Sequence, residues 1–279
     1  MAAMTLESLP SARTYLFVPG MRPERFDKAL ASGADRVVLD LEDAVSPDDK
    51  ASARSAVATW MQGATTIDAS RIVVRINDAA SRWFAEDLAA LAETRAAAVL
   101  LPKAESAAQV AETRNAVPDA SILALIESAR GVSEVDHIAA AGVQRLVFGT
   151  LDFALDLDMD ISTDASGLAY AASRIVIASR LAGLPTPVAG VTPQLDDKER
   201  LLSDLADARR FGFGAKLCIH PRQVQPIHTA LRPSAHALDW ARRVLDADAA
   251  SPGVARLDGR MIDRPVVLHA RRTVALARN

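Results

Sequence analysis

The fold is decided by residues 97–149, which read AAVLLPKAESAAQVAETRNAVPDASILALIESARGVSEVDHIAAAGVQRLVFG. Three short runs rich in Val, Ile and Leu alternate here with two Ala-rich stretches of helical period. The runs are almost continuously apolar, which is typical of strands that are buried on both faces of a parallel sheet. This part of the chain therefore predicts a β-α-β-α-β unit.

The same alternation extends in both directions and repeats eight times. The predicted strands are Thr14–Pro19, Arg36–Leu41, Ile72–Ile76, Ala97–Pro102, Ile122–Ile126, Arg145–Gly149, Pro187–Val191 and Ala215–His220. The predicted helices are Pro23–Ser32, Pro47–Met61, Ser81–Thr94, Ser106–Ala116, Val132–Ala140, Ser166–Ala182, Leu195–Phe211 and Pro221–Leu231. Eight such units predict one closed (β/α)₈ barrel of the TIM type. The alternative is an open doubly wound sheet, whose G-x-G-x-x-G turn after the first strand is absent.

The barrel is expected to take up residues 13–233, after a short N-terminal lead-in of residues 1–12. Residues 234–279 form a C-terminal extension with predicted helices at Ala235–Ala247 and Arg264–Ala277. This extension is too short for a domain of its own. We expect it to lie over the barrel mouth or to reach the active site of a neighbouring subunit.

Composition and charge exclude several classes of partner. The 279 residues are 50% hydrophobic and 24% charged, as in an ordinary globular protein, and carry a net charge of -3. No positive field is present to hold nucleic acid or an anionic membrane. No signal peptide and no long apolar run is recognisable, so we expect a cytoplasmic protein. The single cysteine, Cys218, has apolar neighbours and is predicted to be a buried strand thiol, not a nucleophile.

Polar side chains collect where the predicted strands end. In a barrel of this kind, the carboxyl ends of the strands meet at one mouth, where the chemistry takes place. Any one of these side chains could be an ordinary solvated loop residue, but together they predict a functional mouth. They are Glu42, Asp43, Arg75, Lys103, Glu127, Asp152 and His220.

Glu127 and Asp152 follow strands five and six, which are neighbours in the predicted barrel. Two carboxylates held together repel each other unless one is protonated or a cation lies between them. Hard oxygen ligands suit Mg²⁺ or Mn²⁺, with water and substrate oxygens completing the coordination. Zinc is disfavoured, because the five histidines show no zinc-ligand spacing.

Arg75 ends strand three and is placed to bind a substrate carboxylate through two parallel hydrogen bonds. A structural salt bridge to Glu42 or Asp43 explains the same position equally well, and the spacing does not decide between them. The turn from Gly149 to Asp152 offers backbone N–H groups as a second carboxylate cradle.

These residues together resemble the citrate lyase beta-subunit and malyl-CoA lyase branch of the metal-dependent keto-acid aldolases. The resemblance covers about residues 13–277. It rests on Arg13–Gly20, Leu39–Val45 with Lys50 and Ala53–Arg54, Val74–Asn77, Leu101–Glu105, Leu125–Ala129, Phe148–Asp152, Gly212–Lys216 and Ile219–Pro221.

The resemblance implies a (β/α)₈ barrel in which Glu127 and Asp152 bind Mg²⁺. It also implies that Arg75 grips the keto-acid part of the substrate. The substrate-contacting positions expected beside these are Phe17, Lys28, Glu42, Asp43 and Leu151. Of these, Phe17 and Lys28 would lie near coenzyme A, and Arg22 and Arg25 are basic residues that can share this role.

The segment from Asp258 to Val267 resembles the C-terminal segment of malyl-CoA and citramalyl-CoA lyases. There, an aspartate of one subunit completes the active site of a neighbour, and Asp263 is the matching residue. A simpler explanation is that Asp263 is the N-cap of the last helix, with Pro265 in its first turn. The two roles are compatible.

The resemblance therefore predicts a Mg²⁺-dependent carbon–carbon lyase that is a homotrimer or homohexamer. By a retro-Claisen reaction it would cleave a 3-hydroxyacyl-CoA of malyl, citramalyl or citryl type. The products would be acetyl-CoA or a homologue and oxaloacetate, glyoxylate or pyruvate, with Asp263 handling the proton at the thioester carbon. The alternatives are the beta subunit of a citrate lyase complex, which acts on an acyl-carrier-protein thioester, and an aldolase of free keto acids. A barrel that binds without catalysis would require a broken site, whereas Arg75, Glu127 and Asp152 are all present.

Overall fold

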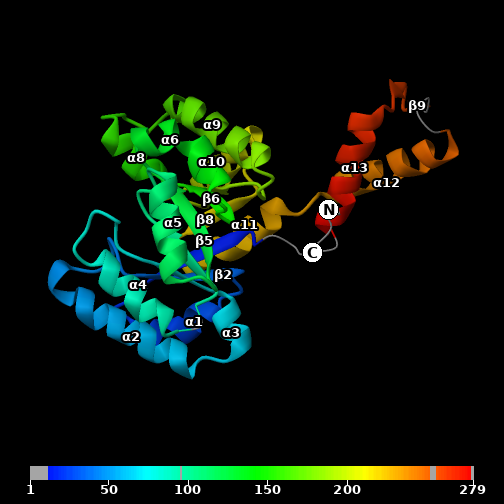
Figure 1. The fold of residues 1–279 in the computed structure, drawn as a ribbon. Helices are drawn as coiled ribbons and strands as arrows, with labels where there is room; N and C mark the ends of the chain where they lie inside the picture. Colours follow the sequence, from blue (N-terminus) through cyan, green and yellow to red (C-terminus); the bar gives the residue numbers. More distant parts are fainter. Residues whose placement is uncertain (1–11, 95, 252–255, 278–279) are drawn as a thin grey trace. The chain divides into compact units, whose positions relative to one another are not determined.

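Eight parallel strands form a closed barrel in the order of the sequence, with β8 paired back to β1 (Figure 1). The computed structural model describes residues 12–94, 96–251 and 256–277. The strands are β1 (Thr14–Pro19), β2 (Arg36–Asp40), β3 (Ile72–Arg75), β4 (Ala98–Leu101), β5 (Ser121–Ile126), β6 (Arg145–Phe148), β7 (Val188–Ala189) and β8 (Ala215–Cys218). All eight predicted strands are found, so the predicted barrel is confirmed.

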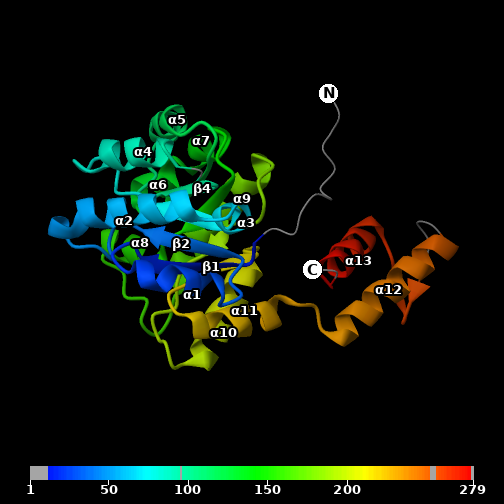
Figure 2. The ribbon, with the colours of Figure 1, turned by 90° about the horizontal axis from the view of Figure 1, so that it is seen from below.

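Helices surround the strands on the outside of the barrel, as Figures 1 and 2 show. They are η1 (Pro23–Arg25), α1 (Phe26–Leu30), η2 (Pro47–Asp49), α2 (Lys50–Gly63), α3 (Thr66–Ser70), α4 (Phe84–Ala92), α5 (Ala107–Ala116), α6 (Ala129–Ser133), α7 (Val135–Ala140), α8 (Thr150–Asp156), η3 (Ser166–Leu168), α9 (Ala169–Leu181), α10 (Lys198–Phe211), η4 (Pro221–Gln223) and α11 (Val224–Leu231). Each predicted barrel helix corresponds to one or more of these elements.

The structure corrects the prediction in several details. The short helices α3 and α8 were not predicted, because five and seven residues are too few to show a helical period. The predicted helix Val132–Ala140 is two helices, α6 and α7. Strand β7 has two residues in place of the predicted five, and it lies between Pro187, which has no N–H to donate, and Gly190.

The inside of the barrel is filled by one side chain in two along each strand. Val38, Val73, Leu123, Val147 and Leu217 belong to this buried cluster. Because side chains alternate along a strand, their neighbours in sequence face the helices instead. Cys218 is one of these outward residues, and burial raises the pKa of its thiol to about 12. The prediction of a buried strand thiol is confirmed.

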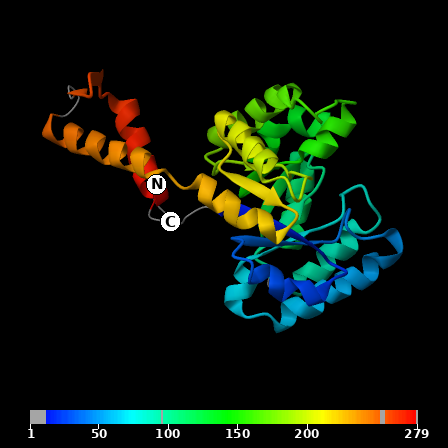
Figure 3. The same ribbon diagram turned by 180° about the vertical axis from the view of Figure 1, so that it is seen from behind.

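The chain divides into two compact units, one of Ala12–Ile227 and one that begins at His228. The second unit contains α12 (Ala235–Ala250) and α13 (Arg264–Ala277), which lie side by side (Figure 3). Ala241, Val244 and Val267 belong to its small apolar core. The predicted loop between the helices contains a hairpin of two-residue strands, β9 (Arg256–Leu257) and β10 (Arg260–Met261). None of the described helices has the length and apolarity needed to cross a membrane.

Candidate active site at the carboxyl ends of the strands

A cavity of about 400 Å³ opens at the carboxyl ends of the barrel strands. We call it the mouth cavity. It brings together six of the nine predicted site residues, which come from β1, β2, β3, β5 and β6 or the segments that follow these strands. The six are Phe17, Asp43, Arg75, Glu127, Leu151 and Asp152. Glu42 lies behind this lining and contacts Arg75, whereas Lys28 and Asp263 do not line the cavity.

Arg75 is held by three carboxylates. Its Nε and Nη2 donate to the two carboxylate oxygens of Asp40 at 2.7 and 2.6 Å. Its Nη1 donates to Asp43 at 3.0 Å and lies 2.9 Å from Glu42 Oε2. The salt bridge predicted as one alternative is therefore present. Its main partner, however, is Asp40, which the prediction did not name.

The arrangement around Arg75 is rigid. Asp40 also accepts hydrogen bonds from the backbone N–H groups of Glu42 and Ala44, so the carboxylate is fixed to the loop after β2. The ring of Phe17 lies 4.9 Å from the Arg75 guanidinium carbon, within cation–π distance. Burial alone would lower the pKa of Arg75, but the neighbouring carboxylates, Asp40 first, outweigh burial and raise it. Arg75 is therefore a permanent cation in a fixed position.

Glu127 follows directly after β5 and is 4% exposed. Its Oε1 accepts a hydrogen bond of 2.8 Å from the backbone N–H of Lys103. A side chain at Gly149 would put its Cβ 2.6 Å from Glu127 Oε2, so only glycine leaves room for this carboxylate. Burial is the main reason that the pKa of Glu127 is raised to about 8, and the negative charges of Glu42 and Asp152 add to it. At neutral pH this carboxyl group is therefore mostly protonated unless a cation lies beside it.

Lys103 is the residue that positions Glu127, and it does so from a strained backbone. Its φ of 42° lies in the left-handed region, which is uncommon for any residue except glycine. This conformation aims its N–H at Glu127, while its Nζ lies 3.3 Å from Glu42 Oε1. Lys103 thus contacts two of the buried carboxylates.

Carboxyl groups outnumber cations at the mouth. Five carboxyl groups, those of Asp40, Glu42, Asp43, Glu127 and Asp152, lie near three cations, Arg75, Lys50 and Lys103. Burial raises the pKa of Glu42 to about 7, against the lowering effect of Arg75. With Glu42 and Glu127 ionised, negative charge would be in excess at the mouth, and a divalent cation would stabilise that state.

Asp152 lies in the first turn of α8, where the predicted turn from Gly149 to Asp152 is in fact helical. Its carboxylate makes no hydrogen bond or ion pair with the residues that the structure describes. Nowhere in this part of the chain do three or more His, Cys, Asp or Glu form a metal cluster. Two carboxylates with water and substrate oxygens in the remaining positions are a common ligand set for Mg²⁺. Glu127 and Asp152 therefore fit a Mg²⁺ ion.

The remaining predicted residues lie elsewhere. Three of them are exposed basic residues of the first helical segment: Arg22 precedes η1, Arg25 ends it, and Lys28 lies on α1. Arg22 is paired with Glu24 at 2.7 Å. Asp263 is exposed in the second unit, and its Oδ1 accepts a hydrogen bond of 3.1 Å from the N–H of Val266. The expected N-cap of the last helix is therefore present.

Comparison with known proteins assigns the family. The sequence profile of the HpcH/HpaI aldolase/citrate lyase family matches residues 13–221. The chain belongs to this family. A citrate lyase subunit beta-like protein of Mycobacterium tuberculosis is 40% identical, over 92% of each chain. A (3S)-malyl-CoA thioesterase of Cereibacter sphaeroides is 33% identical, over 95% of this chain and 94% of the relative.

The solved structures agree. The M. tuberculosis protein CitE in complex with magnesium, acetoacetate and coenzyme A has a TM-score of 0.86 and 38% identity, with 97% of this chain and 100% of that one covered. The citrate lyase beta subunit of the same organism, in complex with oxaloacetate and magnesium, has a TM-score of 0.70 and 38% identity over 80% and 98% of the two chains. As a citrate lyase beta-like member of the HpcH/HpaI aldolase/citrate lyase family, the protein is a carbon–carbon lyase.

Sequence reasoning assigned no role to two residues of this lyase's mouth, Asp40 and Lys103. Asp40 and Arg75 are direct partners in the register of β2 and β3, which spacing in the sequence does not show. Opposite charges at such paired strand ends predict an ion pair. No signal in the sequence showed the left-handed backbone of Lys103.

Proposed function

We propose that this protein is a Mg²⁺-dependent lyase that cleaves a 3-hydroxyacyl-CoA, of malyl, citramalyl or citryl type, into acetyl-CoA or a homologue and a 2-keto acid. The observation that carries the proposal is the mouth cavity, in which Glu127, Asp152 and Arg75 line one space and the carboxyl groups outnumber the cations. Solved relatives that bind magnesium with oxaloacetate, or with acetoacetate and coenzyme A, support it.

Glu127 and Asp152 would hold the metal ion. Mg²⁺ would supply Lewis-acid polarisation of the substrate's hydroxyl and carbonyl oxygens. The backbone N–H of Lys103 keeps Glu127 oriented for this role. Mn²⁺ prefers the same hard oxygen ligands and should replace Mg²⁺.

Arg75 would bind the carboxylate of the keto-acid part. Its Nε–Nη2 edge is taken by Asp40, so a substrate can reach only the edge of Nη1 and Nη2. Asp43, whose side chain is 60% exposed, occupies this edge and would give way to the substrate carboxylate. The ion pair with Asp43 would thus hold Arg75 in place until the substrate arrives.

The other proposed roles follow from the family resemblance. Phe17, at the cavity wall, and Lys28, with Arg22 and Arg25, would contact coenzyme A. Leu151 would line the acyl pocket, next to Asp152. Asp263 of a neighbouring subunit would transfer the proton at the thioester carbon, in a homotrimer or homohexamer.

The test is a panel of malyl-, citramalyl- and citryl-CoA assayed with Mg²⁺ and with EDTA. Each reaction is analysed for acetyl-CoA and keto acid, the lyase products, and for free coenzyme A and hydroxy acid, the products of thioester hydrolysis. The second pair is measured because one relative is named a (3S)-malyl-CoA thioesterase. Acyl-carrier-protein thioesters and free hydroxy acids are included as the two alternative substrates. Release of hydrolysis products alone would overturn the lyase assignment.

Glu127→Gln should abolish turnover and also the effect of Mg²⁺ on stability. In the wild type, Mg²⁺ at about a hundredfold its dissociation constant should raise the free energy of unfolding by about 2.7 kcal/mol. In Glu127→Gln the increase should disappear. Asp263→Asn is the matched control, because it should lose turnover and keep the stabilisation by Mg²⁺. An EDTA-insensitive rate in the wild type would contradict the metal site.

A further inference from the structure

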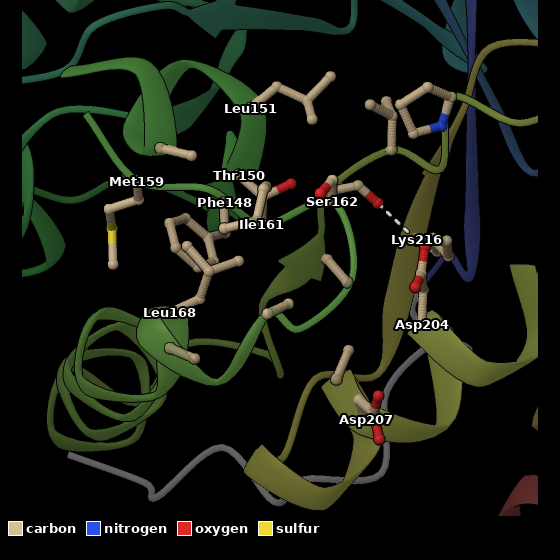
Figure 4. Close-up of a pocket in the computed structure, with 18 of the residues that line it drawn as sticks. Phe148, Thr150, Leu151, Met159, Ile161, Ser162, Leu168, Asp204, Asp207 and Lys216 are labelled. Atoms are coloured by element: carbon tan, nitrogen blue, oxygen red, sulfur yellow. Dashed lines mark hydrogen bonds between the residues drawn. The ribbon is translucent and has the colours of Figure 1, made fainter. Parts of the chain in front are cut away.

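A second cavity, of about 510 Å³, lies on the outside of the barrel between the β6–β8 wall and helices α8, α9 and α10 (Figure 4). We call it the outer cavity. Its barrel-side wall includes Phe148, Ala189 and Lys216, whose neighbours in sequence face the barrel interior. The volume is in the range of small-molecule binding sites. Glu127 and Arg75 do not line it, so this space is separate from the proposed metal site.

Most of the outer cavity is apolar. Phe148, Met159, Ile161 and Leu168 lie together in the cavity, and Lys216 and Asp204 lie apart from them (Figure 4). An apolar pocket with a few convergent polar groups is typical of a site for a small molecule with an apolar body.

Lys216 is 2% exposed and lines this cavity from β8. Its Nζ donates one hydrogen bond, of 2.8 Å, to the carbonyl oxygen of Gly190. An ammonium group has three donors, so two have no acceptor among the residues that the structure describes. Burial lowers the pKa of Lys216 to about 8, and the charge of Asp204 only partly opposes this effect. At neutral pH the group is therefore still a cation.

The carboxylates around the cavity are already engaged. Asp204 accepts hydrogen bonds from Thr192 Oγ1 at 2.6 Å and from Arg200 Nε at 2.7 Å. Asp207 is paired with Arg210. Asp160 accepts from the backbone N–H of Ser162 at 2.9 Å.

Arg200 also has partners. Its Nη1 donates to the backbone carbonyl of Ser162 at 2.9 Å, and its Nε donates to Asp204. Of the two cations that line the cavity, Lys216 is 2% exposed and makes no hydrogen bond to a carboxylate of the described residues, whereas the side chain of Arg200 is 30% exposed and paired with Asp204. A buried cation with free donors binds an anionic oxygen most strongly.

We propose that the outer cavity binds a monocarboxylate with an apolar body, whose carboxylate accepts hydrogen bonds from Lys216 Nζ and whose hydrocarbon part packs against Phe148, Met159 and Leu168. Its ligand would not contact Glu127 or Arg75, although Thr150, Leu151 and Val191 line both cavities. One anionic head and one apolar body match the two kinds of lining that the cavity presents.

The test is isothermal titration calorimetry of the full-length protein with three probes of equal chain length, octanoate, 1-octanol and octylamine. Octanoate should bind at one molecule per chain, at least about tenfold more tightly than octanol, and octylamine should bind most weakly. Lys216→Met should weaken octanoate binding by roughly ten- to hundredfold and change octanol binding by less than about twofold, because only the charged hydrogen bonds are lost.

Ala208→Trp, on the cavity side of α10, should fill the space and remove binding of all three probes. Ala206→Trp is the matched control, because Ala206 is exposed on the same helix and does not line the cavity. Glu127→Gln should bind octanoate like the wild type, which separates this site from the mouth cavity.

Equal affinity of the wild type for octanoate and octanol would overturn the proposal, as would the absence of octanoate binding. Unchanged octanoate affinity in Lys216→Met would do the same. If Lys216→Met does not fold, as judged by circular dichroism, the three-probe comparison on the wild type decides the question by itself.

Discussion

Arg75 and Lys216 are two buried cations of the same barrel, and their surroundings differ. Arg75 is held by Asp40, Glu42 and Asp43, and these carboxylates raise its pKa. Lys216 has one carbonyl acceptor, and burial lowers its pKa. Burial alone therefore does not set the properties of a buried cation. The mouth has more carboxyl groups than protein cations, and the outer cavity has a cation with unused donors.

The largest expected effect is that of removing the cation at the mouth. Arg75→Met leaves Asp40 and Glu42 buried without their partner, so we expect the free energy of unfolding to fall by about 3–5 kcal/mol. Urea unfolding without added Mg²⁺ measures this change. Arg22→Met, in the exposed pair with Glu24, is the control and should change it by less than about 1 kcal/mol. A loss of less than about 1 kcal/mol in Arg75→Met would show that the two regions do not differ as described.

The second prediction concerns the pH dependence of stability at Lys216. The pKa of this group is about 8 in the folded protein and about 10.5 when unfolded, so the unfolded chain binds more protons between these pH values. Wild-type stability should therefore rise with pH from about 8 to 10.5, by on the order of 3 kcal/mol relative to Lys216→Met.

Urea unfolding at several pH values measures the difference between the two proteins. Groups other than Lys216 titrate in both, so their contributions cancel in the difference. Parallel curves for wild type and Lys216→Met would mean that Lys216 keeps an ordinary pKa, and the comparison with Arg75 would fail.

The smallest expected effect separates the partners of Arg75. Asp43 is 60% exposed at its side chain, whereas Asp40 is 2% exposed. Asp43→Asn should therefore lower the free energy of unfolding by no more than about 1 kcal/mol. In the lyase assay it should change KM for the hydroxyacyl-CoA more than kcat, because it alters the edge of Arg75 that the substrate would use. A loss of several kcal/mol would show that the exposed pair is structural.

The sequence predicted the barrel because apolar runs such as Ile122–Ile126 indicate strands that are buried on both faces, and eight such runs each followed by a helix fit a closed parallel sheet. The sequence also predicted that Glu127 and Asp152 lie at the same mouth of the barrel, because residues that follow adjacent parallel strands are close together. Strand β7 was less predictable, because its two residues are held by pairing with Val147 and Ala215, not by a pattern of their own.

The charge network was only partly predictable. Several carboxylates are close enough in sequence to pair with Arg75. The one that accepts the two hydrogen bonds from Nε and Nη2 is set by the register of β2 and β3, not by spacing in the sequence. The outer cavity could not be predicted at all. It depends on the packing of α8, which showed no helical period, and on Lys216, which appeared in the sequence only as one polar residue in an apolar strand.

Thr150, Leu151 and Val191 line both cavities. These three side chains are therefore a shared partition, and the size of one compartment cannot be altered there without affecting the other. A substitution there that widens the mouth cavity for a bulkier substrate would also change the shape of the outer cavity. Any redesign of this enzyme's selectivity at those positions would have to be screened against two ligands at once.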